Sequence, residues 1–402
     1  MPVARRDERY VPALASGFVE HVDGIRAVAA LYVACSHAFL LTLDSQRAVL
    51  PGLLLKLTDW LGDGELGVAA FIVVSGYCLM LPVLRTPDWT FSGGFKRFIA
   101  RRARRIVPPY YAALVISIAL YVFSEHVVGR HVALQKFVPH ILAHLALVHN
   151  LFSAGGAHYF NAALWSVALE WQIYFMFGLA LLPLARRIGV FATMLLATGL
   201  GIVPRFFLHG VLDWTAPWFV GLFVAGMGAA AVAHSPRLRF RELATRIPFG
   251  TAVAGAGAVT LGILLFQTTE NREALKVFED LAAGIAVALG LAAVGVGLAA
   301  SSRTAVRVAA LLSAKPLVFV GAFSYSLYLV HWPLVVAAVA LMQRAGVAAP
   351  LQFALALGVV IPATVVFAYG FYLVAERPFV STFRRAATQR ELGATAMVPP
   401  HA

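Results

Sequence analysis

Long apolar stretches alternate with short polar segments along most of this 402-residue chain. Each stretch approaches or exceeds the ~18 apolar residues that a helix needs to cross a bilayer. The eight clearest are Leu66–Val83, Ile106–Val122, Leu164–Leu184, Trp214–Ala233, Phe249–Phe266, Leu281–Ala300, Leu317–Met342 and Phe353–Leu373. Two less uniform segments, Ile25–Leu43 and Gly189–Val203, complete the set. The pattern therefore predicts an all-α, polytopic bundle of about ten transmembrane helices.

Composition agrees with this pattern. The chain is 60% hydrophobic and only 13% charged, which is outside the range of soluble globular domains. The polar first twenty residues do not match a cleavable signal peptide, so we expect them to be retained. No Ser/Gly linker divides the chain. We predict a short N-terminal segment over 1–21, one membrane domain over 22–376 and a short tail over 377–402.

The distribution of basic residues predicts the orientation. With ten spans and the N-terminus inside, 24 of the 32 Lys and Arg residues fall on the cytoplasmic side. This matches the positive-inside rule and places both termini in the cytoplasm. Counting Pro139–Asn150 as another span would move Arg186 and Arg187 outside, so we interpret that segment as interfacial or re-entrant. Because the net charge of +13 is explained by membrane topology, we expect the bilayer as partner and no nucleic acid.

Arg26 and His37 are the first candidates for chemistry, because ionisable residues within spans are costly. They are eleven residues apart, which leaves ~20° of net rotation and ~16 Å of rise on one helix. They therefore share a helix face, with His37 in the outer half. The alternative is structural: Arg26 pairs with Asp23, and His37 bonds to a neighbouring helix.

Four arginines precede the third span: Arg101, Arg102, Arg104 and Arg105. Guanidinium groups pair with phosphates, so this cluster is suited to a polyanionic cofactor such as coenzyme A. It is equally suited to fixing topology beside lipid phosphates.

Glu170 lies within a span and has no basic residue in helical reach. A buried carboxylate needs a partner from another helix or from a ligand. In the predicted topology it shares the outer half of the membrane with His37.

Histidines also gather between the third and fourth spans. His140 and His144 have the i, i+4 spacing of a metal pair, with His149 and His158 nearby. No acid or cysteine joins them, so we expect interfacial or acceptor-contacting histidines and no metal. Polar residues also recur in Ser324–Pro333, including Tyr328 and His331, either to bond neighbouring helices or to line a cavity.

Six motifs in order resemble the acyltransferase-3 family of bacterial membrane O-acyltransferases, over almost the whole chain. They are Asp23-Gly24-Ile25-Arg26 with His37, Gly67–Tyr77 with Ser75, the Arg-rich Lys96–Tyr111, Trp165–Tyr174 with Glu170, Ser324–Pro333, and Glu376-Arg377-Pro378-Phe379. One departure is Ala69, where many members carry Asp. Glu65, on a similar helix face, either substitutes for that carboxylate or the function is dispensable.

The resemblance implies an enzyme of the bacterial inner membrane that transfers an acyl group, acetyl in the first instance, from cytoplasmic acyl-CoA. The acceptor would be a hydroxyl of an extracytoplasmic glycan or lipid-linked saccharide. His37 would act as general base or accept the acyl group transiently, with Glu170 orienting the imidazole or the acceptor. Arg26 and the four-arginine cluster would hold the donor. Further polar positions implied by the motifs are Asp23, Ser75, Tyr77, Trp165, Tyr174, Tyr328 and His331.

Two other functions compete with this one. Polytopic bundles with buried charge also form transporters or flippases of lipid-linked glycans, although the sequence shows no internal repeat. A non-catalytic membrane sensor has no recognisable output domain in the sequence.

Overall fold

The computed structural model describes residues 20–44, 52–129, 137–152, 158–209, 212–268 and 270–380. All regular secondary structure in these ranges is helical, which confirms the predicted all-α class. Most of the predicted N-terminal segment, and the tail beyond residue 380, lie outside the described residues.

Ten helical segments of the described chain are long and apolar enough to cross a membrane. They are α2 (Glu20–Thr42), α4 (Glu65–Leu84), α5 (Gly94–Val127), α8 (Leu164–Met176) with its continuation through η6 (Phe177–Leu181) and α9 (Leu182–Ile188), α10 (Val190–Phe207), η7 (Asp213–Thr215) with α11 (Phe219–His234), α13 (Phe249–Phe266), α14 (Arg272–Ala299), α17 (Ser324–Arg344), and α18 (Ala349–Leu355) with η8 (Ala356–Val360), α19 (Ile361–Phe371), η9 (Tyr372–Glu376) and η10 (Arg377–Phe379). The prediction of a multi-pass membrane protein is confirmed.

Two segments of the sequence do not form single continuous spans. The stretch Leu317–Met342 is not one helix: α16 (Lys315–Ala322) and α17, which begins at Ser324, are separated at Phe323, and α16 is bent by 56° from α15 (Arg303–Leu312). Counted as one span, α15 and α16 would bring the total to eleven. In Pro139–Asn150 the chain instead forms α6 (Phe137–Leu145), whose nine residues are too short to cross hydrocarbon.

The remaining short elements connect the spans. They are α3 (Gly52–Thr58), η3 (Asp59–Gly62), η5 (His149–Leu151) and α12 (Leu238–Arg246).

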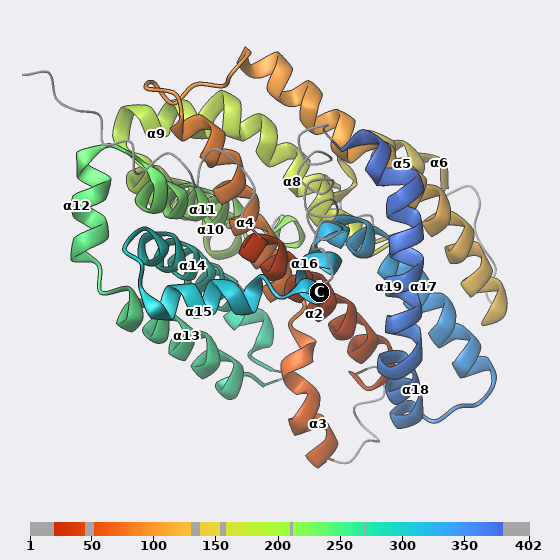
Figure 1. Ribbon diagram of the computed structural model, residues 1–402. Coiled ribbons are helices and arrows are strands. Elements are labelled where there is room, and N and C mark those ends of the chain that lie inside the picture. Colours follow the sequence, from red (N-terminus) through yellow and green to blue (C-terminus); the bar gives the residue numbers. More distant parts are fainter. Residues whose placement is uncertain are drawn as a thin grey trace, which may run out of the picture.

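Helix α4 occupies the middle of the bundle (Figure 1). It packs against α2, α11 and α14, while α17 contacts α2, α5 and α19. The contact between α4 and α11 depends on glycine. A Cβ on Gly76 would lie 2.0 Å from the Phe223 carbonyl oxygen, and one on Gly226 would lie 2.0 Å from that of Val73. Small residues of this kind let membrane helices approach backbone to backbone.

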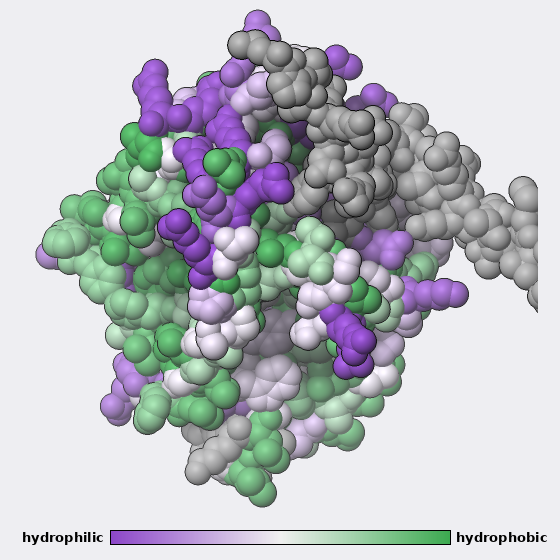
Figure 2. Space-filling view, turned by 60° about the vertical axis from the view of Figure 1, so that its left-hand side comes forward, coloured by the Kyte–Doolittle hydropathy of each residue, from purple (hydrophilic) through white to green (hydrophobic). Residues whose placement is uncertain are grey.

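Apolar side chains face outward over much of the bundle. Helix α13 buries none of its residues, yet its sequence is almost entirely apolar. Figure 2 shows hydrophobic residues spread over the left part of one face, with hydrophilic residues gathered toward its upper part. An apolar exterior of this extent is suited to lipid.

Two ends of the bundle can be distinguished along α4. The "arginine end" is the end at which α4 finishes, beside Arg85 and the arginines at the start of α5. The "Glu65 end" is the opposite end, where α4 begins. Because α2 runs antiparallel to α4, Arg26 lies toward the arginine end beside Cys78, and Ser36 lies beside Gly64.

Candidate active site

A cavity of about 490 Å³ lies inside the bundle and reaches the arginine end. Helices α2, α4, α5, α8 and α17 contribute to its wall. The wall carries four arginines and three acidic residues: Arg26, Arg85, Arg102, Arg105, Asp23, Glu170 and Glu376. We call this space the arginine cavity. Its volume is in the range of pockets that bind small molecules and cofactors.

Arg26 is anchored on the wall of this cavity. Its Nη1 donates to Asp23 Oδ1 at 2.9 Å, and its Nη2 contacts the Cys78 sulfur at 3.5 Å. This pairing with Asp23 is the structural alternative predicted for Arg26 from the sequence. It also holds the guanidinium at the cavity. Gly24 makes this geometry possible, because a Cβ there would lie 1.8 Å from the Leu312 carbonyl oxygen.

The four-arginine cluster divides into two pairs. Arg102 and Arg105 line the arginine cavity, whereas Arg101 and Arg104 are exposed on another side of α5. Arg102 Nε is buried and has no hydrogen-bond partner among the described residues. Arg85, one of the basic residues counted on the cytoplasmic side, joins Arg102 and Arg105 on the wall.

Glu170 is satisfied by hydroxyl groups rather than by a cation. Ser75 Oγ donates to Glu170 Oε1 at 2.7 Å, and the Tyr174 hydroxyl donates to the same oxygen at 2.5 Å. All three side chains line the arginine cavity. They form a polar cluster at mid-length on α4, since Ser75 is ten residues from Glu65.

The structure separates Glu170 from His37, which the sequence analysis placed in the same half of the membrane. Helix α8 begins inside the bundle rather than at its surface. Asn161, just before it, is fully buried and donates to Ser117 Oγ and to the Leu329 carbonyl. Glu170 therefore lies at the level of Ser75, about 15 Å along α4 from its start.

His37 instead forms a hydrogen-bonded pair with a second histidine. His37 Nδ1 and His331 Nε2 are 2.8 Å apart, and the two rings stack at 9° with centroids 5.0 Å apart. The Trp332 ring packs nearly perpendicular to His37, with ring centroids 4.6 Å apart. His331 is fully buried, whereas His37 is partly exposed.

The backbone around His331 determines where the protons lie. His331 Nδ1 is 2.8 Å from the Tyr328 carbonyl oxygen, and a carbonyl only accepts, so this nitrogen carries a proton. In the neutral ring Nε2 is then an acceptor, and His37 Nδ1 must donate to it. His37 Nε2 is left with its lone pair, which is the form required of a base or nucleophile.

Aromatic residues stand between the arginine cavity and this histidine pair. Phe71 and Tyr328 form an edge-to-face contact with centroids 5.6 Å apart, and both line the cavity. Tyr328 also packs against His331, and its hydroxyl lies 2.7 Å from Ser166 Oγ. His37 and His331 are not on the cavity wall.

The last span contributes Glu376 through an irregular turn. A π-helical turn, η9, ends at Glu376, and Ser326 Oγ donates to its Oε2 at 2.6 Å. Such turns are frequent at functional sites. Nothing in the local sequence distinguishes this turn from regular helix, so only the motif resemblance indicated Glu376.

Two of the other predicted positions face away from the arginine cavity. The Tyr77 hydroxyl lies 2.6 Å from His234 Nε2, toward α11. Trp165 lines a separate cavity at the Glu65 end.

The clustered histidines stack in pairs. His144 and His149 lie face to face with centroids 3.8 Å apart, and His140 stacks on Tyr159 at the same distance. Stacked rings direct their nitrogens in parallel rather than toward one point. No group of three or more His, Cys, Asp or Glu side chains in the described ranges is arranged to hold a metal ion.

This arrangement defines a polytopic membrane protein with an internal arginine cavity and a histidine pair beyond it. A family model described as an acyltransferase domain matches residues 19–373. The chain therefore belongs to the acyltransferase-3 family, as the motifs indicated.

Named relatives agree with the family. The chain is 24% identical over 355 residues to the peptidoglycan O-acetyltransferase OatA of Listeria monocytogenes, covering 82% of this chain and 50% of that protein. It is 24% identical over 347 residues to the O-acetyltransferase OatA of Staphylococcus aureus, covering 82% and 51%. The chain thus spans about half the length of these relatives. No solved structure matches it.

Proposed function

We propose that this protein is a membrane O-acyltransferase, transferring an acyl group, acetyl in the first instance, from acyl-CoA to a hydroxyl of a glycan or lipid-linked saccharide. The observation that carries the proposal is the His37–His331 pair, which leaves a neutral imidazole with a free lone pair on Nε2 of His37, a partly exposed residue. Family membership and the O-acetyltransferase relatives support the same reaction.

The arginine cavity is the proposed donor site. Arg85, Arg102 and Arg105 would pair with the phosphates of acyl-CoA, since guanidinium groups bind phosphate oxygens bidentately. Arg26, deeper in the cavity, would contact the pantetheine arm or the thioester region. We place this end in the cytoplasm and the Glu65 end outside, on the strength of the positive-inside distribution. The membrane would be the bacterial inner membrane.

Transfer requires the thioester to pass the contact between Phe71 and Tyr328. His37 Nε2 would take the proton of the acceptor hydroxyl while the hydroxyl oxygen attacks the thioester carbonyl. The C–S bond then breaks, and coenzyme A leaves as a thiol with the proton returned by the imidazolium. His331 Nε2 would accept the hydrogen bond from His37 Nδ1–H throughout and so orient the ring, which is one of the two roles predicted from the sequence for Glu170.

Glu170 is assigned a different part in this proposal. With Ser75 and Tyr174 it forms a polar cluster along the donor path, where it would orient the donor arm rather than the imidazole.

One feature favours the rival function of a glycan transporter or flippase. Transporters use broken helices, and α15 and α16 form one bent pair. Incubating the purified protein in nanodiscs with acetyl-CoA and a panel of saccharides distinguishes the two functions. An acyltransferase releases coenzyme A and forms an O-acetyl ester. A transporter moves lipid-linked glycan in proteoliposomes without consuming acetyl-CoA. This result for the purified protein would overturn the proposal.

A further inference from the structure

A second cavity, of about 330 Å³, lies at the Glu65 end of the bundle. The beginnings of α4, α8 and α14 meet around it together with η7. Three tryptophans belong to its wall: Trp165, Trp214 and Trp218. Trp165 lines this cavity, whereas the next residue, Ser166, lines the arginine cavity. The two cavities are therefore neighbours at different depths in the bundle.

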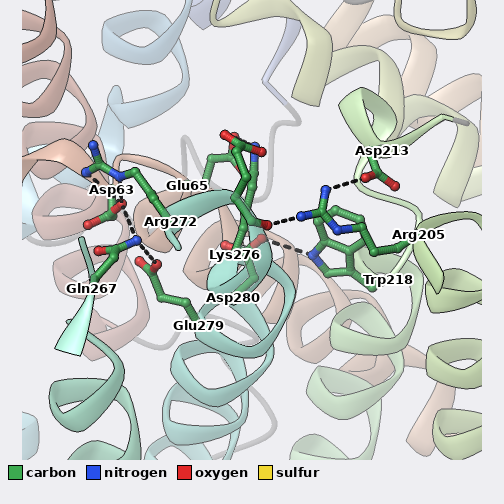
Figure 3. A network of polar contacts seen from close by, with 11 residues as sticks. Asp63, Glu65, Arg205, Asp213, Trp218, Gln267, Arg272, Lys276, Glu279 and Asp280 are labelled. Atoms are coloured by element: carbon green, nitrogen blue, oxygen red, sulfur yellow. Dashed lines mark hydrogen bonds and ion pairs between the residues drawn. The ribbon is translucent and has the colours of Figure 1, made fainter. Parts of the chain in front are cut away.

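Charged side chains complete the wall and pair with one another (Figure 3). Lys276 Nζ lies 2.7 Å from Glu65 Oε1. Arg205 forms an ion pair with Asp213 and also donates to the backbone carbonyl of Glu273. Both cations on the wall are thus engaged. With Glu273 on the same wall, three carboxylates face two cations, so the cavity has a negative balance.

Several polar atoms beside this cavity have unused hydrogen-bonding capacity. Glu65 Oε2, Asp213 Oδ1 and Trp214 Nε1 are buried without a partner among the described residues. Leaving a buried polar atom unsatisfied costs about 1–3 kcal/mol, so native structures usually supply a water or ligand. Two acceptors and one donor match the needs of hydroxyl groups, which both donate and accept.

The backbone that presents Asp213 and Trp214 is held in an unfavourable conformation. The residues on either side of η7, Leu212 and Ala216, have φ angles of 68° and 44°. The left-handed region costs a non-glycine residue about 1 kcal/mol or more, and strained residues of this kind cluster at binding and catalytic sites.

We propose that this cavity binds the acceptor as a neutral saccharide unit, an assignment that rests on the proposed function. Tryptophan rings pack against the apolar C–H faces of a sugar, and carboxylates accept from its hydroxyls. The negative balance disfavours uronic acids and phosphorylated sugars. The cavity is near the proposed base, because His158 lies on its wall and interacts electrostatically with His37.

Transfer kinetics test the assignment. In nanodiscs, with acetyl-CoA as donor and triacetylchitotriose as acceptor, Trp214→Phe removes the Nε1–H donor and one of the two fused rings, and Glu65→Gln removes one charge. Each should raise the KM for the acceptor at least fivefold and leave the KM for acetyl-CoA within twofold. Trp60→Phe is the matched control, because Trp60 is exposed, is not on the cavity wall and donates its Nε1–H to the Leu57 carbonyl; its acceptor KM should not change. Unchanged acceptor KM values in both cavity variants would overturn the assignment.

Binding measured without turnover separates this inference from the proposed function. Calorimetry on the wild-type protein should show triacetylchitotriose binding at least tenfold more tightly than trigalacturonate, and Trp214→Phe should weaken it. Equal binding of the two sugars, or none, contradicts the cavity assignment even if acetyl-CoA turns over. Saccharide binding without acetyl-CoA turnover instead contradicts the proposed reaction and supports the assignment of the cavity as a saccharide site.

Discussion

His37 Nδ1 lies 2.8 Å from His331 Nε2, and the Tyr328 carbonyl lies 2.8 Å from the other nitrogen of His331. This chain of bonds fixes both tautomers and turns the free Nε2 of His37 away from the pair. A positioned base of this kind contributes about 10²–10⁴-fold to a proton-transfer step.

Replacing His331 tests the orienting role. His331→Phe leaves the His37 Nδ1–H without its acceptor, so the imidazole is no longer held in one tautomer. We expect kcat for acyl transfer to fall about 10²-fold, with the KM for acyl-CoA within twofold of wild type. His331→Gln, whose side-chain oxygen can accept, should recover part of the loss.

The control for this experiment is an exposed histidine. His126→Gln, on the surface of α5, should keep wild-type kinetics. An unchanged kcat in folded His331→Phe protein contradicts the orienting role.

Arginine substitutions separate donor binding from topology. Arg102→Gln and Arg105→Gln remove guanidinium groups from the cavity wall, and each should raise the KM for acyl-CoA about tenfold through a lost charge-assisted hydrogen bond. Arg101→Gln and Arg104→Gln remove the same charge from exposed positions and should leave the KM unchanged. Equal effects at all four positions would return the cluster to a topological role.

Gly24 is predicted to be intolerant of any side chain. In Gly24→Ala the new Cβ would lie 1.8 Å from the Leu312 carbonyl oxygen, so α2 must move and carry Asp23 and Arg26 with it. We expect destabilisation of about 1–3 kcal/mol and a raised KM for acyl-CoA. Gly257→Ala on α13 meets no atom within 4 Å and should be neutral or slightly stabilising. Thermal melts in detergent measure both variants, and similar melting temperatures would contradict the close packing.

The stacked histidines predict a stability that falls in acid. Burial lowers the pKa of His144 to about 4, and burial with the neighbouring His144 ring lowers that of His149 to about 2. The unfolded chain takes up these protons near pH 6.5, whereas the folded protein does not. The unfolded state thus binds more protons below pH 6.5, and stability is lost as the pH falls. At pH 5 the loss is about 2 kcal/mol for each histidine.

A single substitution isolates this effect. In His149→Phe, which keeps a ring in the stack, the fall in Tm between pH 7.5 and pH 5 should be clearly smaller than in wild type. His126→Phe serves as the control and should show the full fall. A wild-type Tm that is the same at both pH values would contradict the prediction.

The bundle itself could be predicted from sequence because span length and apolar content are set by the membrane. The break at Phe323 could not, since the stretch from Leu317 to Met342 is apolar throughout apart from its polar motif. Next to the break, Gly321 packs against the backbone of Asp23, which is 298 positions away in the sequence.

The pairings within the candidate site could not be predicted from the sequence. Arg26 and His37 both lie on α2, but the partner of His37 comes from α17, and one of the two partners of Glu170 comes from α4. Helical periodicity specifies which residues share one face of one helix, and it carries no information about the facing helix. The position of Glu170 between the two ends of the bundle was not predicted, because α8 begins inside the bundle, where the buried Asn161 bonds to the Leu329 carbonyl.

The most direct test of the account is acyl transfer by purified His37→Ala protein. In nanodiscs, with radiolabelled acetyl-CoA and a saccharide acceptor, the variant should bind acetyl-CoA with wild-type affinity, because His37 is not on the donor cavity. Its rate of O-acetyl transfer should fall by at least 10²-fold. Folded His37→Ala protein that transfers acetyl groups at a rate near that of the wild type would contradict the central claim.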